Sequence, residues 1–223
     1  MCKIRRHACL IAQILRSKVV IMLARTPQGS KVRNRANMPY LTSEMQQILT
    51  RVEKATGDSA LVQSIHFTPT LMTFARRFVM GGGTIVTDTM LSLTAADTQL
   101  LKQLGLEIKC FIDDPGVIAA AEKKHVTRAE IAVDYAMSLP GMKLFVIGSA
   151  PMALNKLLLR NQLLPMHDVA VLATPTGYAS VVQLKERAWE SNLPAIVTRG
   201  HMGGAQAAMA ILHALLIEIS SAK

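Results

Sequence analysis

Short apolar runs alternate with longer stretches of helical periodicity over most of this chain. Runs in which nearly every residue is apolar are typical of strands buried on both faces, as in a parallel sheet covered by helices. The pattern predicts five such strands, at residues 84–88, 107–113, 143–148, 169–174 and 194–199. We therefore expect an α/β protein with a doubly wound, mostly parallel sheet flanked by helices.

Two helices are predicted before the first strand, over residues 43–57 and 71–80, and glycine marks the end of each. Residues 26–42 are polar, basic and interrupted by glycine and proline, which indicates a linker or an irregular arm. We therefore divide the chain into an N-terminal arm, residues 1–42, and a single α/β domain, residues 43–223.

Composition supports this division. With 223 residues, of which 50% are hydrophobic and 4% aromatic, the chain can bury a large core but has few rings for base stacking with nucleic acid. The formal net charge is +10, yet residues 1–43 hold nine Lys and Arg and no acidic residue, which leaves 16 basic and 15 acidic residues elsewhere. The basic character therefore belongs to the arm. We interpret the arm as a solvated extension; attraction to a polyanionic small molecule, RNA or a membrane surface is the alternative.

The spacing of the cysteines and histidines limits the cellular compartment and the kinds of metal site that this protein is expected to have. The three cysteines form neither a CxxC pair nor an even disulfide set, which indicates a reducing compartment, and Cys110 is expected to be a small buried hydrophobe. The histidines lack HxxxH and HExxH spacing, so no metal site is predicted. Arg16 and Lys18 interrupt the apolar run of residues 8–24, which argues against a membrane span and a signal peptide. We expect a cytoplasmic protein without membrane or nucleic-acid partners.

The turns after the five predicted strands carry much of the polar and glycine content. Because the carboxyl ends of parallel strands meet at one edge of a sheet, these turns are expected to line a common crevice. They are residues 88–90, 113–115, 148–151, 174–178 and 199–204. The segment GHMGGAQAA, residues 200–208, has a backbone that either binds an oxyanion at a helix N-terminus or forms a purely structural turn.

Two of the turns also carry signals for the start of a helix. Gly148 permits a sharp turn, Ser149 is expected to cap the helix that follows, and Pro151 suits its first turn. Asp113 and Asp114 are interpreted as a strand end and a helix cap, with an acidic metal or base pair as the alternative.

Five blocks in a fixed order carry a resemblance to a known family. HFTPTLMTFARR with GGGTIVTDTMLS is similar to the family's "FSP" helix, glycine turn and strand ending in Asp, and CFIDDPGVIAAAEKKHVTRAE is similar to its "DDP…TRS/TRA" block. VIGSAPMALNKLL, TPTGYASVVQLKERA and IVTRGHMGGAQAAMAILHALL are similar to "IGNAPTAL…LL", "PVGFVGAAESKEAL" and "VRGRRGGS…A…NALL". From about Ser43 onwards the chain thus resembles the precorrin isomerases, the precorrin-8X or cobalt-precorrin-8 methylmutases of cobalamin biosynthesis.

The resemblance implies an α/β homodimer with active sites near the subunit interface. Such an enzyme is an isomerase that moves a ring methyl from C11 to C12 of a corrin precursor, with a tetrapyrrole as substrate and no cofactor or metal. Carried over by position, the implied substrate contacts are Asp88, Met90, Thr127, Arg128, Gly148, Ser149, Ala150, Pro151, Gly177, Tyr178, Gly200, His201, Gly203 and Gly204.

The sequence departs from the family pattern in three places. Lys54 stands at the position of the family's catalytic histidine and is the implied catalytic residue; a lysine, with a pKa of about 10.4, is a weaker acid than a histidine at about 6.5, so proton transfer is expected to be slower. His66 is an alternative acid. The family's paired basic residues are replaced by His201 and Met202, and residues 1–40 lack its usual N-terminal segments.

Two classes of function follow from these departures. The first is a methylmutase with weakened activity. The alternative is a diverged, non-catalytic relative that binds a tetrapyrrole or another anion. A nucleotide-dependent oxidoreductase is disfavoured because the chain lacks GxGxxG and an acidic residue placed for a ribose.

Overall fold

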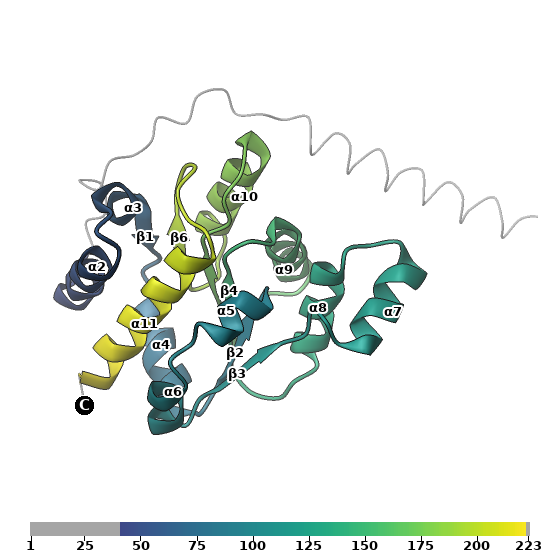
Figure 1. The fold of residues 1–223 in the computed structure, drawn as a ribbon, viewed down its shortest axis with the longest axis horizontal. Coiled ribbons are helices and arrows are strands. Elements are labelled where there is room, and N and C mark those ends of the chain that lie inside the picture. Colours follow the sequence, from purple (N-terminus) through teal and green to yellow (C-terminus); the bar gives the residue numbers. More distant parts are fainter. Residues whose placement is uncertain (1–40, 222–223) are drawn as a thin grey trace, which may run out of the picture. The chain divides into compact units, whose positions relative to one another are not determined.

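The computed structural model of the protein describes residues 41–221. Its centre is a six-stranded sheet in the order β1-β6-β5-β4-β2-β3 (Figure 1). The strands are β1 (Ile65–Phe67), β2 (Thr84–Thr87), β3 (Glu107–Cys110), β4 (Lys143–Ile147), β5 (Val169–Ala173) and β6 (Ala195–Thr198). All five predicted strands are present, whereas the predicted arm lies almost entirely outside the described residues and remains a prediction.

The pairing confirms a doubly wound, mostly parallel sheet. β2, β3, β4, β5 and β6 pair in parallel, and β1 alone is antiparallel, with Ile65 opposite Thr198 of β6. β1 was not predicted, because three residues are too few for a periodic signal. A parallel sheet needs helical crossovers between its strands, and the helices supply them.

The helices are α2 (Ser43–Thr56), α3 (Ser59–Ser64), α4 (Leu71–Met80), α5 (Met90–Thr94), α6 (Thr98–Leu104), α7 (Pro115–Lys124), α8 (Arg128–Met137), α9 (Pro151–Leu163), α10 (Ala179–Trp189) and α11 (Ala205–Ser221). The Thr42 side chain caps the start of α2, and Gly57, at φ 66°, ends it in the left-handed conformation that glycine favours. Both helices predicted before β2 are therefore confirmed.

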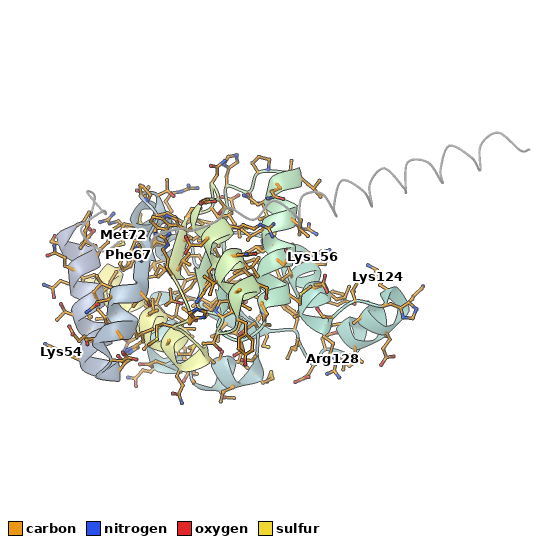
Figure 2. The ribbon with its side chains drawn as sticks, turned by 90° about the horizontal axis from the view of Figure 1, so that it is seen from above. Lys54, Phe67, Met72, Lys124, Arg128 and Lys156 are labelled. Carbon is orange, nitrogen blue, oxygen red and sulfur yellow. The ribbon has the colours of Figure 1, made fainter. Side chains whose placement is uncertain are left out.

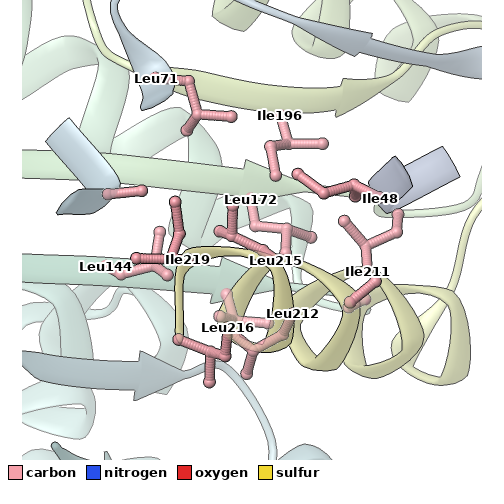
Figure 3. Close-up of a cluster of buried hydrophobic side chains, with 14 of the residues drawn as sticks. Ile48, Leu71, Leu144, Leu172, Ile196, Ile211, Leu212, Leu215, Leu216 and Ile219 are labelled. Atoms are coloured by element: carbon pink, nitrogen blue, oxygen red, sulfur yellow. The ribbon is translucent and has the colours of Figure 1, made fainter. Parts of the chain in front are cut away.

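The two faces of the sheet bury separate sets of apolar side chains. Leu144 and Val146 of β4 pack with α2, α4 and α11 on one face, while Phe145 and Ile147 pack with α8, α9 and α10 on the other. Figure 3 shows the first cluster, in which the apolar side of α11 covers the sheet. Fully burying one Leu or Ile side chain stabilises the fold by about 1.5–3 kcal/mol, so these two clusters account for the continuous apolar runs in the sequence.

The outermost strand, β3, differs from its prediction. The predicted strand ran over residues 107–113, but β3 ends at Cys110 and is only partly buried, with Glu107 exposed. An edge strand has one neighbour, so its side chains are covered less completely than those of a central strand. Cys110 is accordingly half-buried and not a core residue; burial still raises the pKa of its thiol.

The chain reverses direction across the sheet between β2 and β4. The connection from β2 runs through α5 and α6, and Leu101 of α6 belongs to the first cluster. The connection from β4 runs through α9, whose buried residues belong to the second cluster on the opposite face. A crevice between neighbouring strands whose connections leave on opposite faces is a topological switch point, the usual ligand position in such sheets. Within residues 41–221, no helix is long and apolar enough to cross a membrane.

Candidate active site at the carboxyl ends of the strands

Asp88 lies at the switch point and joins β2 to the start of α9. The residue is 7% exposed, and its Oδ2 accepts hydrogen bonds from the backbone N–H groups of Ser149, at 2.6 Å, and Ala150, at 2.7 Å. The expectation that Ser149 caps α9 is therefore wrong: Ala150 is the N-cap, it makes no side-chain cap bond, and a carboxylate from a neighbouring strand does the capping. Pro151 is the first helical residue, as expected.

The second oxygen of Asp88, Oδ1, is buried and has no hydrogen-bond partner among the described residues. Leaving a buried charged acceptor unpaired costs about 1–3 kcal/mol or more, so such an atom calls for an explanation. The fold retains it at the position where the topology favours a ligand.

Two glycines allow the turns after β4, β5 and β6 to approach closely. A Cβ on Gly148 would lie 2.6 Å from Cα of Ala205, and a Cβ on Gly203 would lie 2.1 Å from the Thr174 carbonyl oxygen. Gly203 also has φ 143°, a conformation that L side chains rarely adopt. No side chain fits at either position without a shift of the backbone.

Hydrogen bonds lock the same turns together. Gly204 N–H donates to the Thr174 carbonyl oxygen at 2.6 Å, and the Thr174 hydroxyl donates to the Gly204 carbonyl oxygen at 3.1 Å. His201 Nδ1 lies 3.1 Å from the Gly177 carbonyl oxygen. The predicted convergence of these turns is therefore present in the structure.

Lys185 of α10 is a residue that the sequence analysis missed. It is fully buried, and its Nζ donates to the Met202 carbonyl oxygen at 2.8 Å and to Thr198 Oγ1 at 3.5 Å. Burial lowers the pKa of Lys185 to about 8. Its neighbour Glu186 is engaged by Arg199, with both carboxylate oxygens 2.9 Å from Nε. A signal existed in the sequence, since Lys185 directly follows Leu184 on the apolar face of α10.

Charged residues lie at the carboxyl edge beside β3. Arg128, the first residue of α8, lies 3.4 Å from the Asp113 carboxylate, and both side chains are more than half exposed. Asp114 caps α7 by accepting from Gly116 N–H at 2.8 Å, which confirms the cap interpretation. Thr127 caps α8 in a capping box with Glu130. Within residues 41–221, no three or more His, Cys, Asp and Glu residues are grouped so that they could hold a metal ion.

The remaining implied contacts are exposed apolar residues at the starts of helices. Met90 is the first residue of α5 and is 40% exposed, and Tyr178 is the N-cap of α10 and is 90% exposed. Met90 lies in the turn after β2 and Tyr178 in the turn after β5, so both lie at the carboxyl edge. They provide apolar surface beside the polar turns.

Lys54 lies apart from this edge, whereas His66 lies beside the end of β6, next to residues 199–204. Lys54 is exposed in the last turn of α2, and Figure 2 shows it at the opposite end of the domain from Arg128. His66 is buried in β1, with Nδ1 2.9 Å from the Ser64 carbonyl oxygen and its ring edge-on to Trp189. The Ser64 carbonyl oxygen also accepts from Arg199 N–H at 2.8 Å, so within one chain His66 neighbours the turn after β6, whereas Lys54 is not grouped with the predicted contacts.

The edge thus has two parts, which we name by composition. The acidic half consists of Asp88, Asp113 and Arg128 at the ends of β2 and β3. The glycine half consists of residues 174–178 and 199–204 with Lys185, at the ends of β5 and β6. The Gly148–Pro151 turn lies between them, bound to Asp88 on one side and packed against Ala205 on the other.

Comparison with known proteins shows which class of enzyme this chain is similar to. The chain is similar to enzymes named cobalt-precorrin-8 methylmutase: it is 37% identical to that of Salmonella typhimurium over 139 residues, which cover 62% of this chain and 64% of that protein. It is 31% identical to that of Leptospira interrogans over 182 residues, which cover 77% and 81%. A solved structure of precorrin-8x methyl mutase from Thermus thermophilus superimposes with a TM-score of 0.72 at 25% identity, covering 83% of this chain and 91% of that one.

The family model described as precorrin-8X methylmutase matches residues 29–218. The chain therefore belongs to the precorrin-8X methylmutase family. This confirms the family, the fold and the class of isomerase predicted from the five sequence blocks, and with them a role in cobalamin biosynthesis.

Proposed function

We propose that this protein moves a ring methyl from C11 to C12 of precorrin-8X or its cobalt-bearing form, at the carboxyl edge of its sheet. The observation that carries the proposal is the interlocking of the turns after β4, β5 and β6, on the scaffold of a methylmutase family. The alternative is a tetrapyrrole-binding relative without turnover. It is favoured by the presence of Lys54 where the family has a catalytic histidine.

The chemistry of the edge suits a flat, apolar ring that carries carboxylates. The glycine half offers closely packed backbone and the buried ammonium of Lys185, and Arg128 supplies a second, exposed cation. Met90 and Tyr178 provide apolar contact area for the ring. Asp88 already occupies the N–H groups of Ser149 and Ala150, so a substrate carboxylate would have to displace it to use them.

A homodimer is part of this proposal. Lys54 and Arg128 lie at opposite ends of one chain (Figure 2), so one substrate could contact both only if they come from different subunits. Each site would then combine the carboxyl edge of one subunit with the end of α2 of its partner. A cytoplasmic location, where thiols stay reduced, also belongs to the proposal.

The deciding experiment is a single-turnover assay followed by absorbance, with precorrin-8X and with cobalt-precorrin-8. Conversion to the hydrogenobyrinate spectrum, or its cobalt form, supports the methylmutase. Binding that perturbs the spectrum without conversion over hours supports the non-catalytic relative. If the protein neither binds nor converts either pigment, both functions are ruled out.

Variants of Lys54 test its role as the acid. Lys54→Ala is expected to lower the rate while leaving the substrate Kd within about tenfold, because an exposed lysine at a helix end contributes little to the fold. Lys54→His should raise the rate, because a histidine donates a proton more readily near neutral pH. An unchanged rate in Lys54→Ala would remove Lys54 from the mechanism.

Mixed subunits test the shared site. Lys54→Ala and Arg128→Ala proteins, each impaired alone, are unfolded, mixed and refolded together. If sites are shared between subunits, mixed dimers contain one intact site, and about a quarter of the wild-type rate returns. No recovery, in a sample that sedimentation shows to be dimeric, would contradict a site shared between subunits.

A further inference from the structure

The two halves of the edge carry opposite charge. In the glycine half, the ammonium of Lys185 donates to the Met202 carbonyl oxygen and to Thr198 Oγ1, and the nearby Glu186 carboxylate is itself paired with Arg199. In the acidic half, Arg128 is the counter-ion of Asp113, and Asp88 receives backbone N–H groups on one oxygen only. The substrate of the proposed function carries carboxylates on side chains around an apolar ring, so different orientations place different side chains at the switch point.

The charge of the Asp88 carboxylate is poorly screened by solvent and salt. Its side chain is buried, and Oδ1 lies against protein on all sides without a donor. A charge held away from water acts over a longer distance than an exposed one, because neither solvent nor salt reduces its field effectively. Asp88 directly follows β2, and its backbone N–H donates to the Val146 carbonyl oxygen of β4, so the charge lies at the switch point between the two strands.

We propose that Asp88 is a specificity-determining residue that orients the substrate, by keeping carboxylate side chains away from the switch point and on the side of the glycine half. This rests on the proposed function. The negative charge does not favour binding of a polyanion as such; it raises the energy of the wrong orientations. The migrating methyl group is thereby presented to the same part of the site in every binding event.

Asp88→Asn separates this role from capping. The amide oxygen can still accept both N–H bonds, so the start of α9 is kept, while the charge is lost. We expect kcat to fall by about tenfold, because unproductive orientations become populated. The substrate Kd should be unchanged or tighter, because a repulsive charge has gone, and Tm should stay within about 3 °C.

Asp97→Asn is the matched control. Asp97 also caps a helix through two N–H groups, those of Gln99 and Leu100, but it is exposed at the start of α6. It should leave both kcat and Kd unchanged. Wild-type kcat in Asp88→Asn, or a weaker Kd, would overturn the proposal.

A second variant covers the case in which Asp88→Asn does not fold. Leu91, three residues beyond Asp88, is 66% exposed, so Leu91→Lys can place a positive charge near Asp88 without disturbing the core. It should again lower kcat without weakening Kd. Leu163→Lys is its control, because Leu163 is 86% exposed at the far end of α9. Equal kcat in both lysine variants would contradict an orienting charge.

The wild-type protein distinguishes the two failures. If it binds or converts neither pigment, the proposed function fails. If it converts substrate and Asp88→Asn converts it equally fast, only the orienting role fails.

Discussion

The acidic half and the glycine half lie at the same edge of one sheet but are built by different means. In and beside the acidic half, side chains make the structure: Asp88 caps α9 from the neighbouring strand, while Asp114, next to Asp113, caps α7, and Thr127, next to Arg128, caps α8. In the glycine half, the backbone makes it: Gly203 and Gly204 close on Thr174, and the carbonyl oxygen of Met202 receives Lys185.

The difference sets how each half responds to substitution. A capping side chain can be replaced by an isostere that keeps its hydrogen bonds, so charge and structure can be varied separately. Gly203 has no such substitute, because a Cβ there would lie 2.1 Å from the Thr174 carbonyl oxygen. The acidic half is therefore where specificity can be altered, and the glycine half is where the shape of the site is fixed.

The largest effect is expected from Gly203→Ala. Its Cβ would collide with the Thr174 carbonyl at φ 143°, so we expect a loss of about 3 kcal/mol or more in the free energy of unfolding. Turnover should be abolished with it. Urea unfolding and the single-turnover assay measure the two effects.

Gly200→Ala is the control for this substitution. Gly200 has φ 75°, and nothing lies within 4 Å of an added Cβ, so only the backbone strain of about 1 kcal/mol is expected. Equal losses in the two variants would show that the contact with Thr174 is not what fixes the turn.

The next effect concerns Lys185 and pH. The unfolded lysine keeps its proton to about 10.5, whereas the buried one loses it near pH 8, so between these values the unfolded state binds more protons. The stability of the wild type should therefore rise by up to about 3 kcal/mol over this interval, relative to Lys185→Met.

The measurement for Lys185 is urea unfolding of both proteins at the two ends of that interval. Thr198 still donates to the Met202 carbonyl in Lys185→Met, so the variant should fold. Parallel pH curves for the two proteins would show that Lys185 does not titrate there. In the wild type alone, affinity for the carboxylate-bearing substrate should fall as pH rises through about 8.

The smallest effect is expected from Tyr178→Ala. Tyr178 is 90% exposed, so Tm should not change, while the loss of one ring contact should weaken the substrate Kd by about threefold to tenfold. Fluorescence or absorbance titration measures it, with Tyr135→Ala on α8 as a less exposed comparison. If Kd stays at the wild-type value, Tyr178 lies outside the binding surface.

Most of the fold could be predicted from the sequence, because the signals for its strands and helices are local. Continuous apolar runs predicted β2, β4, β5 and β6, and glycine with capping residues predicted the bounds of α2 and α4. The prediction overextended β3 and missed β1, because exposure at a sheet edge and pairing with a distant strand depend on neighbours that a sequence window does not contain. The family could also be recognised from the sequence, because its motifs occur in a fixed order.

The candidate site was predictable as a set of turns, but not as a set of contacts. Convergence of the turns follows from the parallel sheet, and Asp114 as a cap follows from its position before a helix. Ser149 was the wrong cap, because the carboxylate that does the capping comes from a residue 61 positions earlier. Lys54 matches a family motif, but where it lies relative to Arg128 is a property of the folded chain.

The sequence by itself determined the class of fold, the family and the turns that carry polar chemistry, because apolar periodicity, capping residues and ordered motifs act over short stretches. Only the tertiary structure decided that Asp88 holds α9 with one oxygen and keeps the other unpaired, and that Lys185 is buried under the glycine half. Both depend on which strands and helices become neighbours, and in a parallel sheet those neighbours are brought together by crossovers far longer than any local pattern.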